Sequence, residues 1–80
     1  MARVLIVEDD RNSRLFLTVV LLQMGYEISE ADNAQDALSL FERGEMFDLL
    51  ISDLRMPGID GGEFVAMVRQ QYPELPTIMA

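Results

Sequence analysis

The sequence contains no cysteine, no histidine and no tryptophan, and all six of its basic residues are arginine, so lysine is absent as well. The absence of cysteine excludes disulfide bonds and thiolate metal sites. The absence of histidine removes the commonest general base and the commonest ligand of transition metals. The absence of lysine and histidine also means that only arginine could balance a cluster of acids within these 80 residues.

Bulk composition indicates one small globular domain. A chain of 80 residues buries about 60% of the surface that it exposes when unfolded, so its stability is marginal. Half of the residues are hydrophobic, which makes intrinsic disorder improbable. Fourteen acids against six bases give a net charge of −8. Nucleic acid is therefore a poor expected partner, and hard cations are better ones.

Long hydrophobic runs are also lacking. The longest apolar run, residues 15–22, contains Thr18 and is too short to span a bilayer. The first ten residues, MARVLIVEDD, do not have the pattern of a signal peptide. A cytoplasmic protein with no membrane contact is therefore expected.

Short apolar segments alternate with longer helical patterns along the whole chain. The segments expected to form strands are residues 4–7, 26–31, 49–51 and 76–80, and helices are expected over residues 12–24, from 34 to about 43 and from about 61 to 72. This β-α-β-α-β-α-β order predicts an α/β fold with a parallel sheet and right-handed crossovers.

The expected helices carry apolar faces and end signals. The residues expected on these faces are Leu15, Val19 and Leu22 with Phe16 and Val20 beside them, then Ala34, Ala37, Leu38 and Phe41, and then Phe64, Val65 and Val68. Asp10 or Asn12, Asp32 or Asn33, and Asp60 with Glu63 are candidate caps, and Gly25 and Gly44 are candidate helix ends. Met24, Met67 and Met79 are interpreted as core residues.

Carboxylates follow two of the expected strands directly. Glu8, Asp9 and Asp10 follow the first strand, and Asp53 follows the third. In an open parallel sheet, ligands bind beyond the carboxyl ends of the strands, so neighbouring strands would bring these acids together. Oxygen ligands alone favour a hard divalent ion such as Mg²⁺. Asp10 has an equally good alternative role as a helix cap.

The segments VLIVEDD at 4–10 and DLLISDLRMPGIDG at 48–61 together resemble the receiver domain of two-component response regulators. The resemblance extends from Arg3 to Ala80, so residues 1–80 are interpreted as one receiver domain that is incomplete at its C-terminus. It implies a flavodoxin-like doubly wound parallel sheet with strand order 2-1-3-4, lacking the fifth strand and the last two helices.

Site residues follow from this resemblance position by position. Asp53 falls on the phospho-acceptor, and Glu8 and Asp9 fall on the acidic pair that holds Mg²⁺. The family more often has Asp at the first of these positions, so Glu8 would act through a water. Arg55 falls on the position whose main-chain carbonyl completes the metal site, and Pro57 and Gly58 would shape that loop.

The resemblance also implies a signalling role rather than an enzymatic one. The expected partner is a sensor histidine kinase, and the expected function is acceptance of its phosphoryl group in a phosphorelay. The family's switch Ser or Thr and its phosphate-contacting lysine are not among these 80 residues. The alternative is therefore a receiver fragment that binds metal and self-associates but is not competent to phosphorylate or signal. A phosphatase-like hydrolase is disfavoured because residue 55 is Arg where an Asp-x-Asp motif needs a second Asp.

Self-association is expected from the surfaces that such a fragment leaves open. Strand 76–80 would be an unpaired edge, and helix 12–24 would cover its face of the sheet alone. Alternate side chains of residues 4–7 and 49–51, together with Ile78, would then be partly exposed. A homodimer is the expected result.

Overall fold

A computed structural model describes residues 2–53 and 61–79. Its elements are β1 (Arg3–Val7), α1 (Arg11–Gln23), β2 (Glu27–Ala31), α2 (Ala34–Glu42), β3 (Leu49–Ser52), α3 (Gly61–Gln71) and β4 (Thr77–Met79). Every expected strand and helix is present, with ends that differ by one to a few residues. Arg55, Pro57, Gly58 and Asp60 lie outside the described residues.

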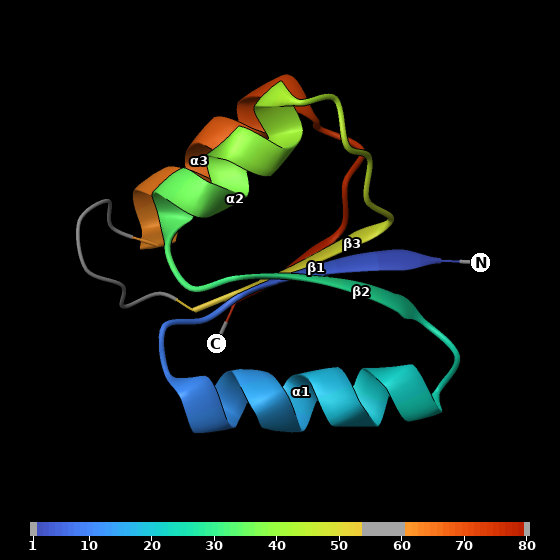
Figure 1. The fold of residues 1–80 in the computed structure, drawn as a ribbon. Helices are drawn as coiled ribbons and strands as arrows, with labels where there is room; N and C mark the ends of the chain where they lie inside the picture. The colour runs from blue at the N-terminus through green and yellow to red at the C-terminus, as the bar shows by residue number, and fades with distance from the viewer. Residues whose placement is uncertain (1, 54–60, 80) are drawn as a thin grey trace.

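The four strands form one parallel sheet in the order β2-β1-β3-β4. Helices α2 and α3 lie on one face of the sheet, and α1 lies on the other (Figure 1). The predicted doubly wound α/β fold and its strand order are therefore confirmed. In this arrangement β1 and β3 are direct neighbours, with Val7 opposite Ser52.

The main core lies between the sheet and the helices α2 and α3. It consists of Leu5, Val7, Ala31, Ala34, Ala37, Phe41, Leu50, Phe64, Val65 and Val68. These include six of the seven residues expected to face inward on the second and third helices, and the seventh, Leu38, is partly buried against them. The strands add Leu5, Val7, Ala31 and Leu50, because each strand sends alternate side chains to this face. The core therefore anchors the two strands that end in acids.

The apolar stripe expected on α1 does not face the sheet. Its members Leu15, Phe16, Val19, Val20 and Leu22 are all exposed, from 37% for Val20 to 68% for Phe16. The partly buried side of α1 is formed instead by Arg14, Leu17, Thr18 and Leu21. Because α1 is apolar around most of its circumference, hydrophobicity alone does not decide its rotation about its own axis.

On the face of the sheet that α1 covers, the exposure of the strand side chains agrees only in part with the expectation. Val4 and Ile6 were expected to be partly exposed, but both are completely buried because α1 lies across β1 and β2. Farther from α1, Leu49 and Ile51 are half-buried and Ile78 is 53% exposed, as expected.

The methionine interpretation is wrong. Met24, Met67 and Met79 are exposed rather than in the core. All three lie at or near the ends or outer sides of their elements, where their long side chains reach solvent.

Helix ends match their sequence signals. Gly25 and Gly44 have φ values of +90° and +85°, the left-handed conformation that ends a helix at low cost for glycine. Asp10 is the N-cap of α1, and Asn33 is the N-cap of α2. Among the described residues, no helix has the length and apolar character needed to cross a membrane.

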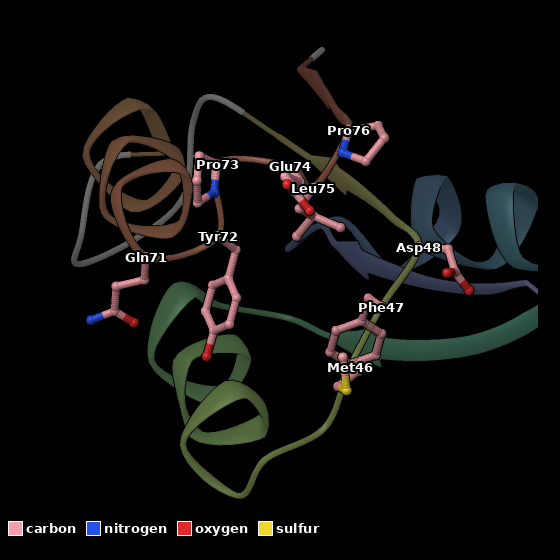
Figure 2. Close-up of a pocket in the computed structure, with 9 residues that line it drawn as sticks. All are labelled: Met46, Phe47, Asp48, Gln71, Tyr72, Pro73, Glu74, Leu75 and Pro76. Atoms are coloured by element: carbon pink, nitrogen blue, oxygen red, sulfur yellow. The ribbon is translucent and has the colours of Figure 1, made fainter.

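A cleft of about 530 Å³ opens at the amino ends of β3 and β4. Figure 2 shows Met46 and Phe47 on one side of it and Tyr72, at the end of α3, on the other. Behind the cleft, the Phe41 ring stacks on Tyr72 with centroids 5.0 Å apart. This cleft lies at the end of the sheet opposite to the acids that follow β1 and β3.

Candidate functional site

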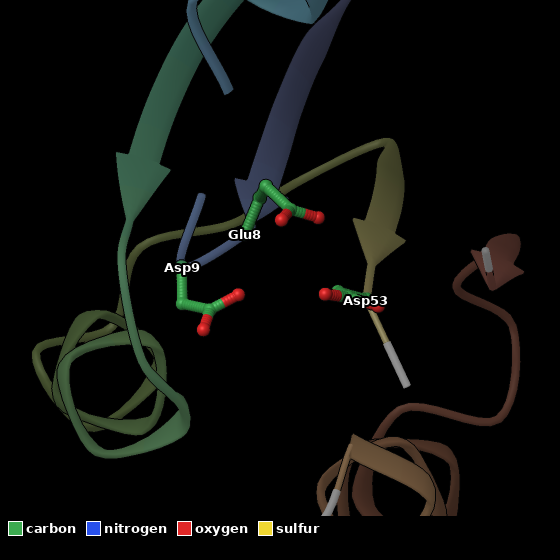
Figure 3. A group of neighbouring side chains, drawn as sticks. All are labelled: Glu8, Asp9 and Asp53. Carbon is green, nitrogen blue, oxygen red and sulfur yellow. The ribbon is translucent and has the colours of Figure 1, made fainter. Parts of the chain in front are cut away.

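Three carboxylates converge at the carboxyl ends of β1 and β3. Glu8 and Asp9 follow β1, and Asp53 follows β3. One oxygen from each of the three lies within 4.8 Å of the others. Figure 3 shows the three side chains turned toward a common space. The parallel pairing of β1 with β3 produces this convergence, because residues that leave neighbouring strands in register emerge side by side.

The backbone of the acids continues the hydrogen bonding of the sheet. The Glu8 N–H donates to the Ala31 carbonyl oxygen at 3.1 Å, and the Asp53 N–H donates to the Val7 carbonyl oxygen at 2.9 Å. Each bond extends a strand ladder by one residue. Glu8 and Asp53 are therefore held by the sheet itself rather than by a free loop.

Glu8 lies where negative charge is unfavourable. Burial is the main reason that the pKa of Glu8 is raised above its ordinary value, and the nearby carboxylates of Asp53, Asp9 and Asp10 add to the rise. The Asp10 N–H, which donates to Glu8 Oε1 at 3.1 Å, acts in the opposite direction. A cation placed among these acids would relieve their repulsion.

Asp10 turns its carboxylate toward α1. Its Oδ2 accepts hydrogen bonds from the Ser13 hydroxyl at 2.7 Å and from the Ser13 N–H at 2.9 Å. These bonds, the hydroxyl bond first, hold the pKa of Asp10 below its ordinary value. The structure thus shows the capping role for Asp10, and the three-carboxylate group does not include it.

The donor set fits a hard divalent cation. Glu8, Asp9 and Asp53 offer only carboxylate oxygens, of the kind that Mg²⁺ takes together with water. Glu8 and Asp53 are half-buried and Asp9 is exposed, so the group is open to solvent on one side. The expected roles of the Arg55 carbonyl, Pro57 and Gly58 stay predictions, since these residues lie outside those described.

Arg14 and Glu30 contact this site indirectly, and neither was identified from the sequence. Arg14 Nη1 donates to the Glu8 carbonyl oxygen at 2.7 Å, and Arg14 Nε lies 3.4 Å from Glu30 Oε1. One signal was available: Arg14 shares its helix face with Leu17 and Leu21, and a lone charge on an apolar face needs a partner.

Comparison with known proteins gives a consistent result. The chain matches the family described as "Response regulator receiver domain" over residues 4–80. The response regulator protein FleR of Pseudomonas aeruginosa is 45% identical over 78 residues, which make up 98% of this chain and 16% of FleR.

Two solved structures are similar to this chain in three dimensions. The response regulator TrrA of Thermotoga maritima, in complex with Mg²⁺–BeF, matches with a TM-score of 0.87 at 37% identity, over 99% of this chain and 66% of that one. The complex of histidine kinase ThkA with TrrA matches with a TM-score of 0.90 at 38% identity, over 99% and 67% of the two chains. The chain thus spans about two thirds of these solved chains and a small part of FleR.

Proposed function

This chain belongs to the family of response regulator receiver domains, the signalling modules of two-component systems, and from that premise we propose that Asp53 accepts a phosphoryl group with the help of Mg²⁺. The observation that supports the proposal is the group of three carboxylates at the ends of β1 and β3. Glu8, Asp9 and Asp53 would hold the ion. When bound, Mg²⁺ neutralises negative charge on the phosphoryl oxygens and on the acids around them.

Asp53 is the proposed nucleophile of this group. Its backbone is tied to Val7, and its carboxylate faces the other two acids. In the proposed transfer, an Asp53 carboxylate oxygen forms a bond to phosphorus while the bond from phosphorus to the donor's imidazole nitrogen breaks. The electron pair of that bond stays on the nitrogen, and the product is an acyl phosphate on Asp53.

A sensor histidine kinase is the proposed donor. Support comes from the match to a response regulator solved in complex with a histidine kinase. A cytoplasmic location and the absence of nucleic-acid binding, both expected from composition, stay predictions.

The Mg²⁺ site can be tested by thermal melting with and without Mg²⁺ in the tens of millimolar range. Binding to the folded state raises the melting temperature by mass action. Asp53→Asn and Asp9→Asn should each lose most of this rise. Asp48→Asn is a matched control, because Asp48 lies at the opposite end of the sheet, where its carboxylate accepts from the Arg3 N–H. A wild-type melt that ignores Mg²⁺ would contradict the site.

Phosphoryl acceptance can be tested with acetyl phosphate and Mg²⁺, followed by mass spectrometry. Modification should require Mg²⁺ and should vanish in Asp53→Asn. It should also be slow, because the 80 residues contain no lysine to stabilise the transferring group, and loss of such a contact commonly costs about 10²–10³ in rate. Complete absence of modification in a protein that binds Mg²⁺ would favour the alternative of a non-competent fragment.

We also propose that these 80 residues self-associate. Five apolar residues of α1 are exposed, and on the edge strand β4 Ile78 and Met79 are 53% and 39% exposed. An open edge beside exposed apolar side chains favours pairing with a second copy, most simply with two-fold symmetry. Sedimentation at tens of micromolar should show a dimer, and a compact monomer there would contradict the proposal.

A further inference from the structure

We propose that Arg14 is a positioning residue of the acid cluster: its guanidinium holds the peptide unit between Glu8 and Asp9 so that both carboxylates face Asp53. This inference rests on the proposed Mg²⁺ site and adds a residue that touches none of the three carboxylates in it. Arg14 lies in the first turn of α1, on the side of the helix that faces the sheet.

The contact that carries the inference is short and shielded. Arg14 Nη1 donates to the Glu8 carbonyl oxygen at 2.7 Å, in a partly buried position. The Arg14 side chain is only 20% exposed. A hydrogen bond from a charged donor at this distance is among the stronger kinds, and partial burial protects it from competition by water.

This carbonyl is a sensitive point because of where it lies in the chain. It belongs to the planar peptide unit that joins Glu8 to Asp9, so its direction sets how the two residues leave β1. The N–H of Glu8 is already fixed by Ala31 of β2. With its carbonyl held by Arg14, Glu8 has both backbone polar groups bonded. The pair of acids therefore starts from a defined backbone.

Arg14 is itself held from a second direction. Its Nε lies 3.4 Å from Glu30 Oε1, and the Thr18 hydroxyl donates to the same oxygen at 3.1 Å. Glu30 belongs to β2, so Arg14 links α1, the end of β1 and the edge strand β2. A planar guanidinium can bond a carbonyl and a carboxylate along two fixed directions at once, whereas a lysine ammonium has no such fixed geometry.

Charge and position predict opposite effects of removing Arg14. As a positive charge near the acids, Arg14 repels a cation, so its removal should tighten Mg²⁺ binding on Coulomb grounds alone. Its charge does reach this segment, since the pKa of Asp10, lowered mainly by the two hydrogen bonds from Ser13, is lowered to a smaller extent by Arg14. As a positioning residue, its removal should weaken binding. Loss of a group that orients metal ligands commonly costs about 10- to 100-fold in affinity.

The experiment is a Mg²⁺ titration followed by amide NMR on wild type, Arg14→Gln, Arg14→Lys and Arg11→Gln. Arg11 is the matched control, because it is an exposed arginine in the same helical turn. We expect Arg14→Gln to bind about 10- to 100-fold more weakly and Arg11→Gln to bind as well as wild type or more tightly. Arg14→Lys keeps the charge and should recover only part of the loss. Equal or tighter binding by Arg14→Gln would overturn the inference.

A metal-free readout separates this inference from the proposed function. In the absence of Mg²⁺, Arg14→Gln should shift the amide resonances of Asp9 and Asp10, and Arg11→Gln should leave that of Asp9 nearly unchanged. If wild type binds no Mg²⁺, the proposed site fails, and unshifted Asp9 and Asp10 amides in Arg14→Gln would separately refute the positioning role.

Thr18→Val decides the question if Arg14→Gln does not fold. This change is neutral in charge and nearly isosteric, and it removes one of the bonds that hold Glu30 in place. The expected result is a weakening of Mg²⁺ binding by a few-fold, in the same direction as for Arg14→Gln. An unchanged affinity in Thr18→Val, in a case where Arg14→Gln is unfolded, would count against the inference.

Discussion

The rotation of α1 predicts which of its leucines stabilise the domain. Leu21 is mostly buried on the side that faces the sheet, whereas Leu15 is 58% exposed. Truncation of a fully buried leucine to alanine costs about 2–5 kcal/mol, and Leu21→Ala should fall near the lower end, at about 2 kcal/mol. Leu15→Ala should cost about 0.5 kcal/mol or less, as expected of a surface position.

The two variants form a matched pair because the same atoms are removed from the same helix. Each gains the same helix propensity from alanine, so the difference between them reports burial. Urea titration followed by circular dichroism, at low micromolar protein, measures both free energies of unfolding. Because a domain of this size has only about 5 kcal/mol in total, Leu21→Ala should shift the midpoint visibly.

Repeating the urea titrations at several protein concentrations tests whether α1 takes part in self-association. If α1 takes part in self-association, the wild-type midpoint should rise with concentration. That rise should be smaller in Leu15→Ala, because Leu15 would contact the second copy. A Leu15→Ala variant that loses as much stability as Leu21→Ala at low concentration would refute the observed rotation of α1.

Three further predictions concern the core, a helix end and pH. Leu50→Ala should cost about 3 kcal/mol or more, because Leu50 is completely buried in the core, and a urea titration at or above wild-type stability would contradict this. Gly25→Ala should cost about 1 kcal/mol in the same assay, since φ is +90° there although nothing would contact the added Cβ. The pKa of Asp10 is lowered by folding, so its contribution to stability is present above its ordinary value of 3.8 and is lost as pH falls through the folded value. Asp10→Asn should therefore lose less stability than wild type between about pH 5 and about pH 2. The raised pKa of Glu8 acts in the opposite direction, but Asp10 is the smallest of its causes, so Glu8 differs little between the two proteins. Identical pH profiles would rule out the capping carboxylate as the cause.

The sheet and the acid group were predictable because they depend on short-range patterns. Four consecutive apolar residues at Val4–Val7 identify a strand that is covered on both faces, and such a strand belongs in the middle of a parallel sheet. Once β1 and β3 are neighbours, the positions of Glu8, Asp9 and Asp53 follow from strand direction alone.

The side of α1 that faces the sheet was not predictable in the same way. Its sequence has apolar residues on nearly all sides, so hydrophobic periodicity allows several rotations. The observed rotation places Arg14 and Thr18 inward, where they bond Glu8 and Glu30. These pairings depend on how a helix and two strands lie together in space. Sequence spacing carries little information on such contacts.

The ladder bonds that hold Glu8 and Asp53 couple the formation of the ion site to the folding of the domain. The two acids lie far apart along the chain and meet only when β1 pairs with β3, so a chain in which these two strands are unpaired has no ion site. Site formation and global folding are then one cooperative event, and the amides of Glu8 and Asp53 should exchange with solvent only through fraying or complete opening of the sheet. Any core substitution that populates the unfolded state would lower ion occupancy in proportion. Such a variant would bind less of the ion although no residue near the carboxylates has been changed.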